Sequence, residues 1–398
     1  MSIFHTIRKA FDLRRPLMRA GAALSVMALA ACEPTGAGGP DTGRSIDPSK
    51  PVQVALLVPG GTGSGDLDWL ARSLTNSAKM AASDAQGATI DLKVYNAGSD
   101  PATAVARANE AVANGAQIIL GPLFADSANA VGSAVAAQGV NVLSFSNNTD
   151  IAGGNVFVLG NTFDNIADRL VAHSVKNGKR RILLLAEDDA AGQVGARAIE
   201  RAIQRNRATL AGTATHPVSQ SGIDGIIPNV AAAASSGNVD AIFMTANQGA
   251  VLPYLTDKLY GAGISSATLQ LMGLTRWDQP AARMQLPGVQ GGWFAIPDNA
   301  RKAQFDQRYR SAYGEAPHDL GSLAYDGVAA IAAQVRSGNR NALTTSGLTQ
   351  NAGFNGITGA FRLRRDGSNQ RALAIATIRN NQMVIIDPAP KSFGGFGF

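Results

Sequence analysis

Polar side chains that could hold a small molecule recur where short apolar runs of the sequence end. Hydroxyl, amide, carboxylate and guanidinium groups all occur among them, and this mixture suits hydrogen bonding to a small polar ligand. The candidates are Thr62, Ser64, Ser127, Ser144, Ser146, Asn147, Asn148, Glu187, Asp188, Asn247, Gln248, Arg276 and Trp277. Each can equally be a solvated loop residue, so we expect only some of them to meet in one site.

Catalytic chemistry is not indicated by these residues. Glu187 and Asp188 come closest to an acid–base pair, but consecutive side chains at a strand end point in different directions. The sequence has no motif for a nucleophilic serine, a phosphate-binding loop or a zinc protease. Its four histidines are too far apart for a helical metal-binding pair, and its single cysteine cannot form an internal disulfide or a cysteine-based metal cage. The sequence therefore predicts a binding protein that is not an enzyme and uses no metal or other cofactor.

Alternating strands and helices must position these candidates. The run VQVALLV at 52–58 is apolar apart from Gln53, as in a strand buried on both faces. Asp100 before Pro101 is a helix start signal, because aspartate caps the first turn and proline fits it. Such patterns predict strands at 52–58, 90–95, 118–120, 140–145, 182–186, 210–215, 241–245, 269–273 and 293–296. They predict helices at 68–85, 101–114, 126–138 (capped by Asp126 or Ser127), 194–205, 223–234, 248–261, 301–313 and 320–337.

Two successive series of such units predict an α/β fold of two doubly wound parallel-sheet lobes joined by a hinge. We expect lobe 1 at 52–165 plus 297–375, lobe 2 at 166–296 plus 376–390, and a disordered tail at 391–398. Doubly wound sheets bind ligands beyond the carboxyl ends of their strands, which places the site in the cleft between the lobes. Asp326, near the start of the last predicted helix, is expected to cap that helix rather than to contact a ligand.

The N-terminus is typical of an exported protein. Residues 1–31 hold five basic side chains and then the apolar run AGAALSVMALAA, which is too short to span a bilayer and indicates a signal peptide. The sequence LAAC that ends at Cys32 resembles the lipobox of bacterial lipoproteins, in which the cysteine becomes the lipid-bearing first residue. Residues 32–51 are rich in glycine and proline and are predicted to be a tether. We expect attachment to a membrane through Cys32, with translation from Met1 or Met18.

Composition and charge indicate a globular protein without a nucleic-acid partner. The chain has 398 residues, 45% hydrophobic and 16% charged, and its length predicts about two domains. Its formal net charge is +6, of which residues 1–31 account for +4, so the exported part carries only +2. That part has no run of lysine and arginine with interleaved aromatic residues, so no nucleic-acid partner is expected.

Six stretches of the chain follow a recognisable order. They are VALLVPGGTG, YNAGSDPATAVARANEAVANGAQIILGPL, GVNVLSFSNNTD, VFVLGNTFDNIADRL, SLAYDGVAAIA and FNGITGAFRLRRDGSNQRALAIATI. Together they resemble the type I periplasmic binding proteins of the leucine-binding family, over nearly all of residues 52–388. The resemblance implies the two-lobed fold with a ligand held between the lobes.

The ligand clamp of that family can be examined position by position. Members that carry branched amino acids hold the α-ammonium and α-carboxylate groups with polar residues at strand ends. The matching positions are Ala125, Asn148, Ala191 and Thr275, where the expected residues are not kept, although Thr149 could act in place of Asn148. Because an unpaired ammonium group is costly to bury, these changes argue against a zwitterionic amino acid as the ligand.

Two functions are open at this point. A lipid-anchored chain of this fold, with GPL at 121–123, NVL at 141–143 and FVL at 157–159, is most similar to the outer-membrane lipoproteins that activate penicillin-binding proteins. That resemblance implies a regulator of peptidoglycan synthesis, on the periplasmic side of the outer membrane, with a penicillin-binding protein as partner. The alternative is a solute-binding lipoprotein of an ABC importer, with a permease and an amino acid or another small polar ligand as partners. The outer membrane is the expected location of the anchor, and the inner membrane is the alternative location.

Overall fold

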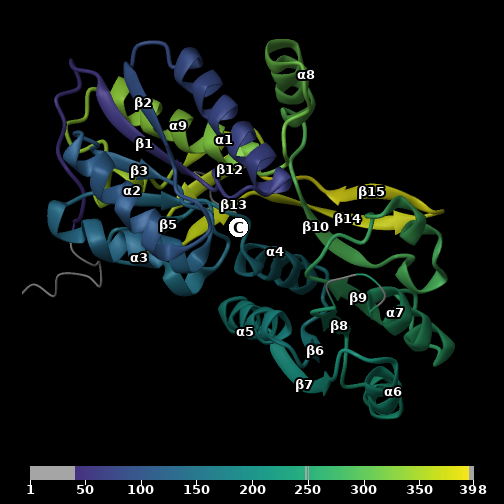
Figure 1. The fold of residues 1–398 in the computed structure, drawn as a ribbon. Coiled ribbons are helices and arrows are strands. Elements are labelled where there is room, and N and C mark those ends of the chain that lie inside the picture. The colour runs from purple at the N-terminus through teal and green to yellow at the C-terminus, as the bar shows by residue number, and fades with distance from the viewer. Residues whose placement is uncertain (1–40, 247–248, 250, 394–398) are drawn as a thin grey trace, which may run out of the picture. The chain divides into compact units, whose positions relative to one another are not determined.

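The structure of the 398-residue chain is a computed structural model that describes residues 41–246, 249 and 251–393 (Figure 1). These residues belong to one compact unit. The predicted signal peptide, Cys32, the first part of the predicted tether, the candidates Asn247 and Gln248, and residues 394–398 lie outside the described residues. In the part of the chain that the structure describes, no helix combines the length and hydrophobicity needed to cross a membrane.

Lobe 1 is built on a five-stranded parallel sheet with the strand order β2-β1-β3-β4-β5. Its strands are β1 (Val52–Val58), β2 (Ile90–Asn96), β3 (Ile118–Leu120), β4 (Asn141–Ser144) and β5 (Val156–Val158). The chain order reverses between β1 and β3, and ligands of doubly wound sheets bind at the carboxyl ends of the strands beside such a point.

Helices cover both faces of this sheet because successive β1 side chains alternate between them. The helices of lobe 1 are α1 (Gly65–Asp84), α2 (Pro101–Ala113), α3 (Ala125–Val135), α8 (Lys302–Tyr313), α9 (Gly321–Arg336) and α10 (Thr345–Leu348). Val54 and Leu56 pack in one core with α1 and α9. Ala55 and Leu57 pack in a second core with α2 and α3. The sequence prediction of a fully buried strand at 52–58 is thereby confirmed.

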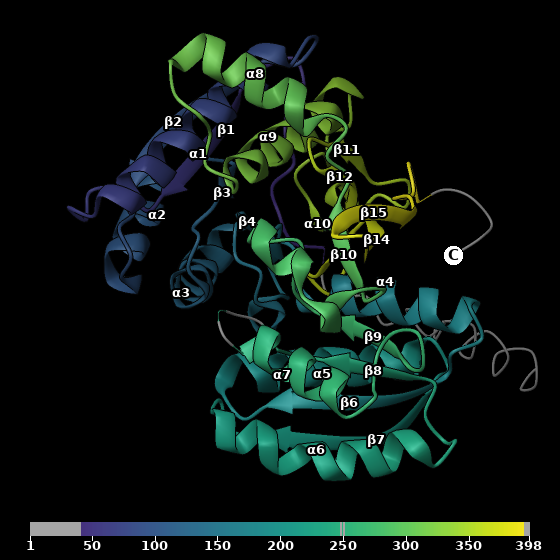
Figure 2. The same cartoon turned by 90° about the vertical axis from the view of Figure 1, so that its right-hand side faces the viewer.

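Lobe 2 is built on a seven-stranded sheet with the order β15-β14-β10-β9-β8-β6-β7. Its strands are β6 (Arg181–Glu187), β7 (Thr209–His216), β8 (Ala241–Met244), β9 (Gln270–Gly273), β10 (Trp293–Pro297), β14 (Leu373–Arg379) and β15 (Gln382–Asp387). Its helices are α4 (Phe163–Lys176), α5 (Ala190–Arg205), α6 (Gln220–Ser235) and α7 (Val251–Gly261). Residues of β6 alternate again, with Leu184 in the core beside α4 and α5 and Leu185 in the core beside α6 and α7. Figure 2 shows α6 running alongside β7.

The chain crosses between the two large sheets three times, from β5 to α4, from β10 to α8, and from β13 (Asn369–Arg371) to β14. The strand β13 belongs to a third, antiparallel sheet, together with β11 (Phe354–Gly356) and β12 (Gly359–Leu363). The predicted α/β fold with two doubly wound lobes is confirmed, with the difference that β14 and β15 pair antiparallel in lobe 2.

Two predicted helix caps are wrong. The N-cap of α3 is Phe124, which makes no side-chain cap hydrogen bond, so neither Asp126 nor Ser127 caps this helix. Ser127 lies inside the first turn and is buried. Asp326 lies in the second turn of α9, is 0% exposed and accepts a hydrogen bond from Ile357 N at 2.7 Å. Local spacing in the sequence does not reveal this hydrogen bond, because Ile357 lies thirty-one residues from Asp326 in the chain.

The second half of the predicted tether is part of lobe 1. Ile46 is 4% exposed and lies in the same core as β1 and α9. Thr42 Oγ1 donates to Asn141 Oδ1 at 2.7 Å, and Asn141 Nδ2 donates to the carbonyl oxygen of Thr42 at 3.2 Å. At the other end of the chain, Phe393 is 7% exposed and packs in the core of lobe 2, although the sequence analysis assigns it to the tail. Ile46 is the apolar side chain of the otherwise polar segment 41–50, and an isolated side chain of this kind is the local sign that the segment packs against the fold.

Ile46→Ala is expected to lower the free energy of unfolding by about 2 kcal/mol, because it removes a buried side chain from a packed core. Urea unfolding of a chain that begins at Asp41 measures this. The control is Lys50→Ala, since the Lys50 side chain is 77% exposed, and it should change stability little. If Ile46→Ala also leaves the stability unchanged, residues 41–50 act as a tether after all.

Candidate functional site

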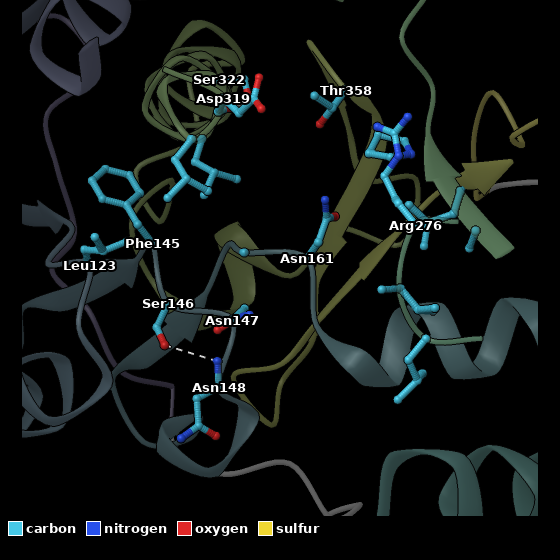
Figure 3. Close-up of a pocket in the computed structure, with 18 of the residues that line it drawn as sticks. Leu123, Phe145, Ser146, Asn147, Asn148, Asn161, Arg276, Asp319, Ser322 and Thr358 are labelled. Atoms are coloured by element: carbon cyan, nitrogen blue, oxygen red, sulfur yellow. Dashed lines mark hydrogen bonds between the residues drawn. The ribbon is translucent and has the colours of Figure 1, made fainter. Parts of the chain in front are cut away.

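A cavity of about 760 Å³ lies at the carboxyl ends of β3 and β4 and is lined by residues of both lobes (Figure 3). Its volume is in the range of small-molecule binding sites. Lobe 1 contributes the segments that follow β3, β4 and β5, together with residues at the starts of α8 and α9. Lobe 2 contributes residues of α4, β10 and β14 and the segment after β9.

The segment after β4 is held in shape by its own side chains. Ser144 is fully buried, and its hydroxyl donates to Pro122 O at 2.8 Å and accepts from Ser146 N at 3.1 Å. Ser146 Oγ accepts in turn from Asn148 N at 3.1 Å, which Figure 3 marks. These turn contacts leave the Ser146 hydroxyl hydrogen and the exposed Asn147 amide available to a ligand.

The segment after β5 approaches this loop so closely that it requires glycine. Gly160 N donates to Ser146 O at 3.0 Å, and a Cβ at Gly160 would lie 2.6 Å from the same oxygen. Asn161 follows, and Figure 3 shows its side chain projecting into the cavity. Asn161 Oδ1 is buried and has no hydrogen-bond partner among the described residues. The cavity therefore contains an amide with unused hydrogen-bonding capacity.

Cationic side chains reach the cavity from both lobes. In lobe 2, Arg276 Nε donates to Asp278 Oδ1 at 2.9 Å and Arg276 Nη2 donates to the other oxygen of the same carboxylate. Such a two-point contact fixes the plane of the guanidinium group. In lobe 1, Lys302 Nζ donates to both oxygens of Asp306, at 2.8 and 2.9 Å. Among the described residues, the acidic member of the lining is Asp319, whose side chain is 93% exposed and therefore well solvated.

The remaining surface of the cavity is largely apolar. It includes side chains from both lobes, namely Leu123, Phe145, Ile166, Leu274, Leu320 and Leu373. Phe145, Leu274 and Leu373 are each 2% exposed, so they belong to the walls rather than to the rim. The site can bind the apolar body of a small molecule and hydrogen-bond its polar ends.

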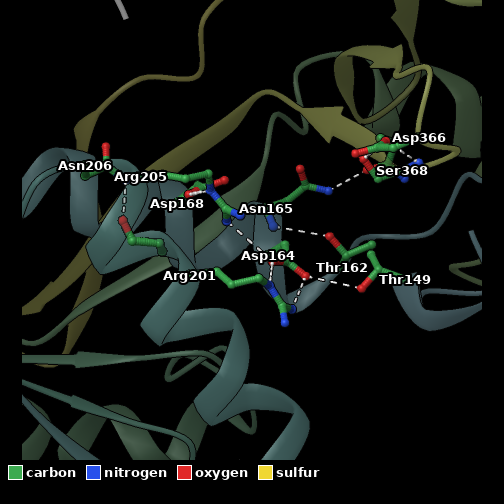
Figure 4. Close-up of polar contacts among 12 residues, drawn as sticks. Thr149, Thr162, Asp164, Asn165, Asp168, Arg201, Arg205, Asn206, Asp366 and Ser368 are labelled. Atoms are coloured by element: carbon green, nitrogen blue, oxygen red, sulfur yellow. Dashed lines mark hydrogen bonds and ion pairs between the residues drawn. The ribbon is translucent and has the colours of Figure 1, made fainter. Parts of the chain in front are cut away.

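The segment after β4, residues 145–149, is called the Ser146 loop below. A charged cluster joins its last residue, Thr149, to lobe 2 (Figure 4). Thr149 Oγ1 donates to Asp164 Oδ2 at 3.3 Å, and Arg201 donates to both oxygens of Asp164 at 2.9 Å. Burial raises the pKa of Asp164, but the hydrogen bonds and positive charges of Arg201 and Arg205 outweigh it and hold the pKa below its usual value. At Asp168 burial outweighs the hydrogen bond and positive charge of Arg205, so the pKa of this carboxyl is raised. Asp164 is therefore ionised at neutral pH and fixes the loop to α4 and α5.

The structure brings four of the sequence-predicted candidates into the cavity lining. They are Ser146, Asn147, Asn148 and Arg276. Ser144 lies beneath the lining and supports it, as described above. Of the positions compared with the leucine-binding clamp, Ala125 and Asn148 line the cavity. Thr275 instead donates from its hydroxyl to Ala246 O at 3.2 Å.

The other described candidates do not line this cavity. Thr62 and Ser64 are exposed, and Ser64 caps α1 by accepting from Leu67 N. Ser127 is 1% exposed and donates to Ser99 O at 3.5 Å. Trp277 is 0% exposed and stacks on Phe294, so it is a core residue of lobe 2.

The acidic candidates also lie away from the cavity lining. Glu187 is 3% exposed at the end of β6, while the neighbouring Asp188 is exposed. Their different environments agree with the argument that consecutive strand-end residues point apart. Within the described residues, no group of three or more histidine, cysteine, aspartate and glutamate side chains is placed to hold a metal ion.

Several polar residues of the lining were missed by the sequence analysis. They are Asn161, Gln279, Asn299, Lys302, Asp319, Ser322 and Thr358. Asn161 could have been found, because it follows the apolar run VFVLG, but β5 has only three residues and was not recognised as a strand. Lys302 and Thr358 lie in segments that reach the cavity only through the crossings between lobes, for which the sequence carries no local signal.

Comparison with known proteins agrees with this geometry. A family model for periplasmic binding proteins matches residues 51–382. The chain belongs to the periplasmic binding protein family. Among curated protein sequences, none matches it.

Solved structures of other periplasmic binding proteins share the fold. One is a putative branched-chain amino acid ABC transporter protein from Rhodospirillum rubrum, with 17% identity, a TM-score of 0.69 and coverage of 85% of this chain and 100% of that one. A second is a leucine-binding protein from Thermotoga maritima, with 16% identity, a TM-score of 0.51 and coverage of 84% and 97%. A third is a solute-binding protein of an ABC transporter from R. palustris in complex with benzoate, with 17% identity, a TM-score of 0.53 and coverage of 86% and 98%. The predicted resemblance to the leucine-binding family is confirmed at the level of the fold.

Proposed function

We propose that this periplasmic binding protein is the solute receptor of an ABC importer and that it carries a small molecule in the cavity between its lobes. The observation that carries the proposal is the cavity itself, because its volume of about 760 Å³ is lined by residues of both lobes. The polar contacts come from a preformed loop with Ser146 and Asn147 and from the amide of Asn161, whose Oδ1 has no partner among the described residues. A ligand that contacts both lobes binds more tightly when the lobes are closed around it than when they are apart, so it stabilises the closed arrangement.

The solved structures that share the fold support this proposal over the penicillin-binding protein activator. They are described as an ABC transporter protein, a leucine-binding protein and a solute-binding protein in complex with benzoate. The activator remains a sequence-based prediction for which the cavity offers no specific support.

The proposed receptor binds its ligand without changing it. Glu187 and Asp188 do not line the cavity, and Lys302 is occupied by both oxygens of Asp306.

The receptor is exported and held at a membrane surface by the lipid on Cys32, as the sequence predicts. Mass spectrometry of the N-terminal peptide tests this anchor, since the lipid adds a defined mass to Cys32 that a Cys32→Ser chain lacks. Fractionation of the envelope then distinguishes the inner from the outer membrane.

The receptor function is tested by thermal unfolding of the chain from Asp41 to Phe398 with a library of amino acids, organic acids, sugars, peptides and muropeptides. A ligand at about 100 times its dissociation constant stabilises the folded state by about 2.7 kcal/mol, which raises the melting temperature by a few degrees. At least one small molecule is expected to do so. A flat response over the whole library, together with capture of a penicillin-binding protein by the same chain, would support the activator instead.

Gly160→Ala is expected to weaken binding of the library ligand by about tenfold or more, because a 1 Å misplacement in a site is costly. The new Cβ would lie 2.6 Å from Ser146 O and must displace the polar loop. Isothermal titration calorimetry measures the affinity. The matched control is Gly225→Ala in α6, where a Cβ meets no atom within 4 Å, and it should bind normally. Equal affinities for the two variants would exclude the Ser146 loop from the binding site.

A further inference from the structure

Lobe 2 presents a positive charge to the cavity. Of its described lining residues, Arg276 is the charged one, and the others that follow β9 or lie on β10 and β14 are apolar or neutral. A guanidinium group donates hydrogen bonds, accepts none and stays charged at all relevant pH values. At Arg276, lobe 2 therefore offers a ligand hydrogen-bond donors alone. The ligand group that contacts Arg276 must be a hydrogen-bond acceptor.

The neighbouring carboxylate orients Arg276 without replacing it as the ligand contact. Asp278 receives the Nε and one Nη2 hydrogen of Arg276, and its side chain is 9% exposed and absent from the cavity lining. The Nη1 group and the second hydrogen on Nη2 are not used in this pair. The Arg276 side chain is 32% exposed, so these remaining donors are accessible. Among the described residues no other hydrogen bond from the Arg276 side chain occurs.

Among the described lining residues, lobe 1 provides no buried acid to bind a cationic group. Its acidic lining residue, Asp319, is 93% exposed, and an ion pair at such an exposed position contributes little. The nearby polar residues Ser146, Asn147 and Asn161 are neutral. An ammonium group in this cavity would therefore face hydrogen-bond donors of Arg276 from lobe 2 and, among the described lining residues, would find no buried carboxylate, which is costly.

We propose that the ligand is a small organic acid with an apolar body and no ammonium group, and that Arg276 is the specificity-determining residue that binds its acidic group. This inference rests on the proposed receptor function and names its substrate class. The carboxylate accepts hydrogen bonds from the free Arg276 donors, and the apolar body packs on Phe145 and Leu274. The neutral amides and the Ser146 hydroxyl bind any second polar group.

The test compares three head groups on one skeleton by isothermal titration calorimetry with the chain from Asp41 to Phe398. The aliphatic set is 4-methylpentanoate, leucine and 3-methylbutylamine, and the aromatic set is phenylacetate, phenylglycine and benzylamine. We expect a carboxylate to bind, its amino-acid analogue to bind about tenfold or more weakly, and the amine to bind least. An amino acid or amine that binds as tightly as the matching acid overturns the inference.

The role of Arg276 is tested with the double variant Arg276→Gln/Asp278→Asn, which removes the pair without leaving a buried charge. It should lose about tenfold or more in affinity for the acid and also most of the preference for acid over amine. The matched control is Arg181→Gln/Asp240→Asn, an arginine–aspartate pair of lobe 2 outside the cavity lining, with a contact of 2.7 Å. Unchanged acid affinity in the Arg276 variant overturns the inference, and a loss in both variants does the same.

The outcomes separate this inference from the receptor function. If none of the six compounds binds but a larger anion from the broad library does, and only the Arg276 variant weakens it, the inference is supported. If the hit is neutral or cationic, the substrate class is wrong while the receptor function stands. If nothing in the library binds, both fail.

Discussion

Replacing Trp277 by alanine is expected to lower the free energy of unfolding by about 3 to 5 kcal/mol. The indole is 0% exposed and stacks on Phe294 with ring centroids 6.5 Å apart. Two glycines lie directly against the indole, since a Cβ at Gly292 would lie 1.9 Å from the ring and a Cβ at Gly273 would lie 2.2 Å from Nε1. Because the indole is fully buried, its removal leaves a large cavity in the core of lobe 2. Urea unfolding measures the loss.

Trp277→Phe serves as the control for this expectation, because a smaller aromatic ring retains part of the packing and should lose less stability. No hydrogen bond complicates the comparison, since Trp277 Nε1 has no partner among the described residues. Gly292→Ala should also destabilise lobe 2, because its Cβ and the indole cannot occupy the same space. If Trp277→Ala instead weakens ligand binding at nearly unchanged stability, the sequence-based assignment of Trp277 to the cleft is restored.

Most strands of the two large sheets and most helices could be predicted because their signals are local. The strand at 52–58 is apolar at every position but Gln53 because both its faces are covered, and Val54 and Ala55 belong to different cores. The predicted cap at Asp100 is confirmed, with Thr103 N donating to its side chain at 2.9 Å. Features of this kind depend only on residues a few positions apart, so one sequence is enough to find them.

The candidate site could be predicted only on the side built from strand ends. Ser146, Asn147 and Asn148 follow a recognised strand, and the rule that ligands bind at carboxyl ends places them in the lining. Thr358 comes from the third sheet and Lys302 from the start of α8, and both reach the cavity through crossings that tertiary packing determines.

A buried carboxylate that looked like a helix cap shows the same limit. Asp326 is paired with Arg371 of β13, which lies forty-five residues further along the chain, so no local pattern reveals the pair.

Arg371→Met is expected to lower the free energy of unfolding by about 3 to 5 kcal/mol, because it leaves a buried carboxylate without its cation. Arg371 Nη1 lies 3.3 Å from Asp326 Oδ2, and the two side chains are 3% and 0% exposed. Burial raises the pKa of Asp326, and the positive charge of Arg371 opposes that rise. Urea unfolding of the chain from Asp41 to Phe398 measures the change.

The double variant Asp326→Leu/Arg371→Met should recover much of the lost stability, since it removes the unpaired charge along with its partner. The surface pair of Arg308 and Asp84 is the control, and Arg308→Met should cost less than about 1 kcal/mol because its side chain is 48% exposed. A loss below about 1 kcal/mol for Arg371→Met would mean that Asp326 no longer carries an unsolvated charge, either because water reaches it or because it binds a proton. Arg371 Nε also donates to Leu159 O at 2.8 Å, one residue before the glycine that touches the Ser146 loop. The single variant is therefore expected to weaken ligand binding as well, which connects the buried pair to the cavity.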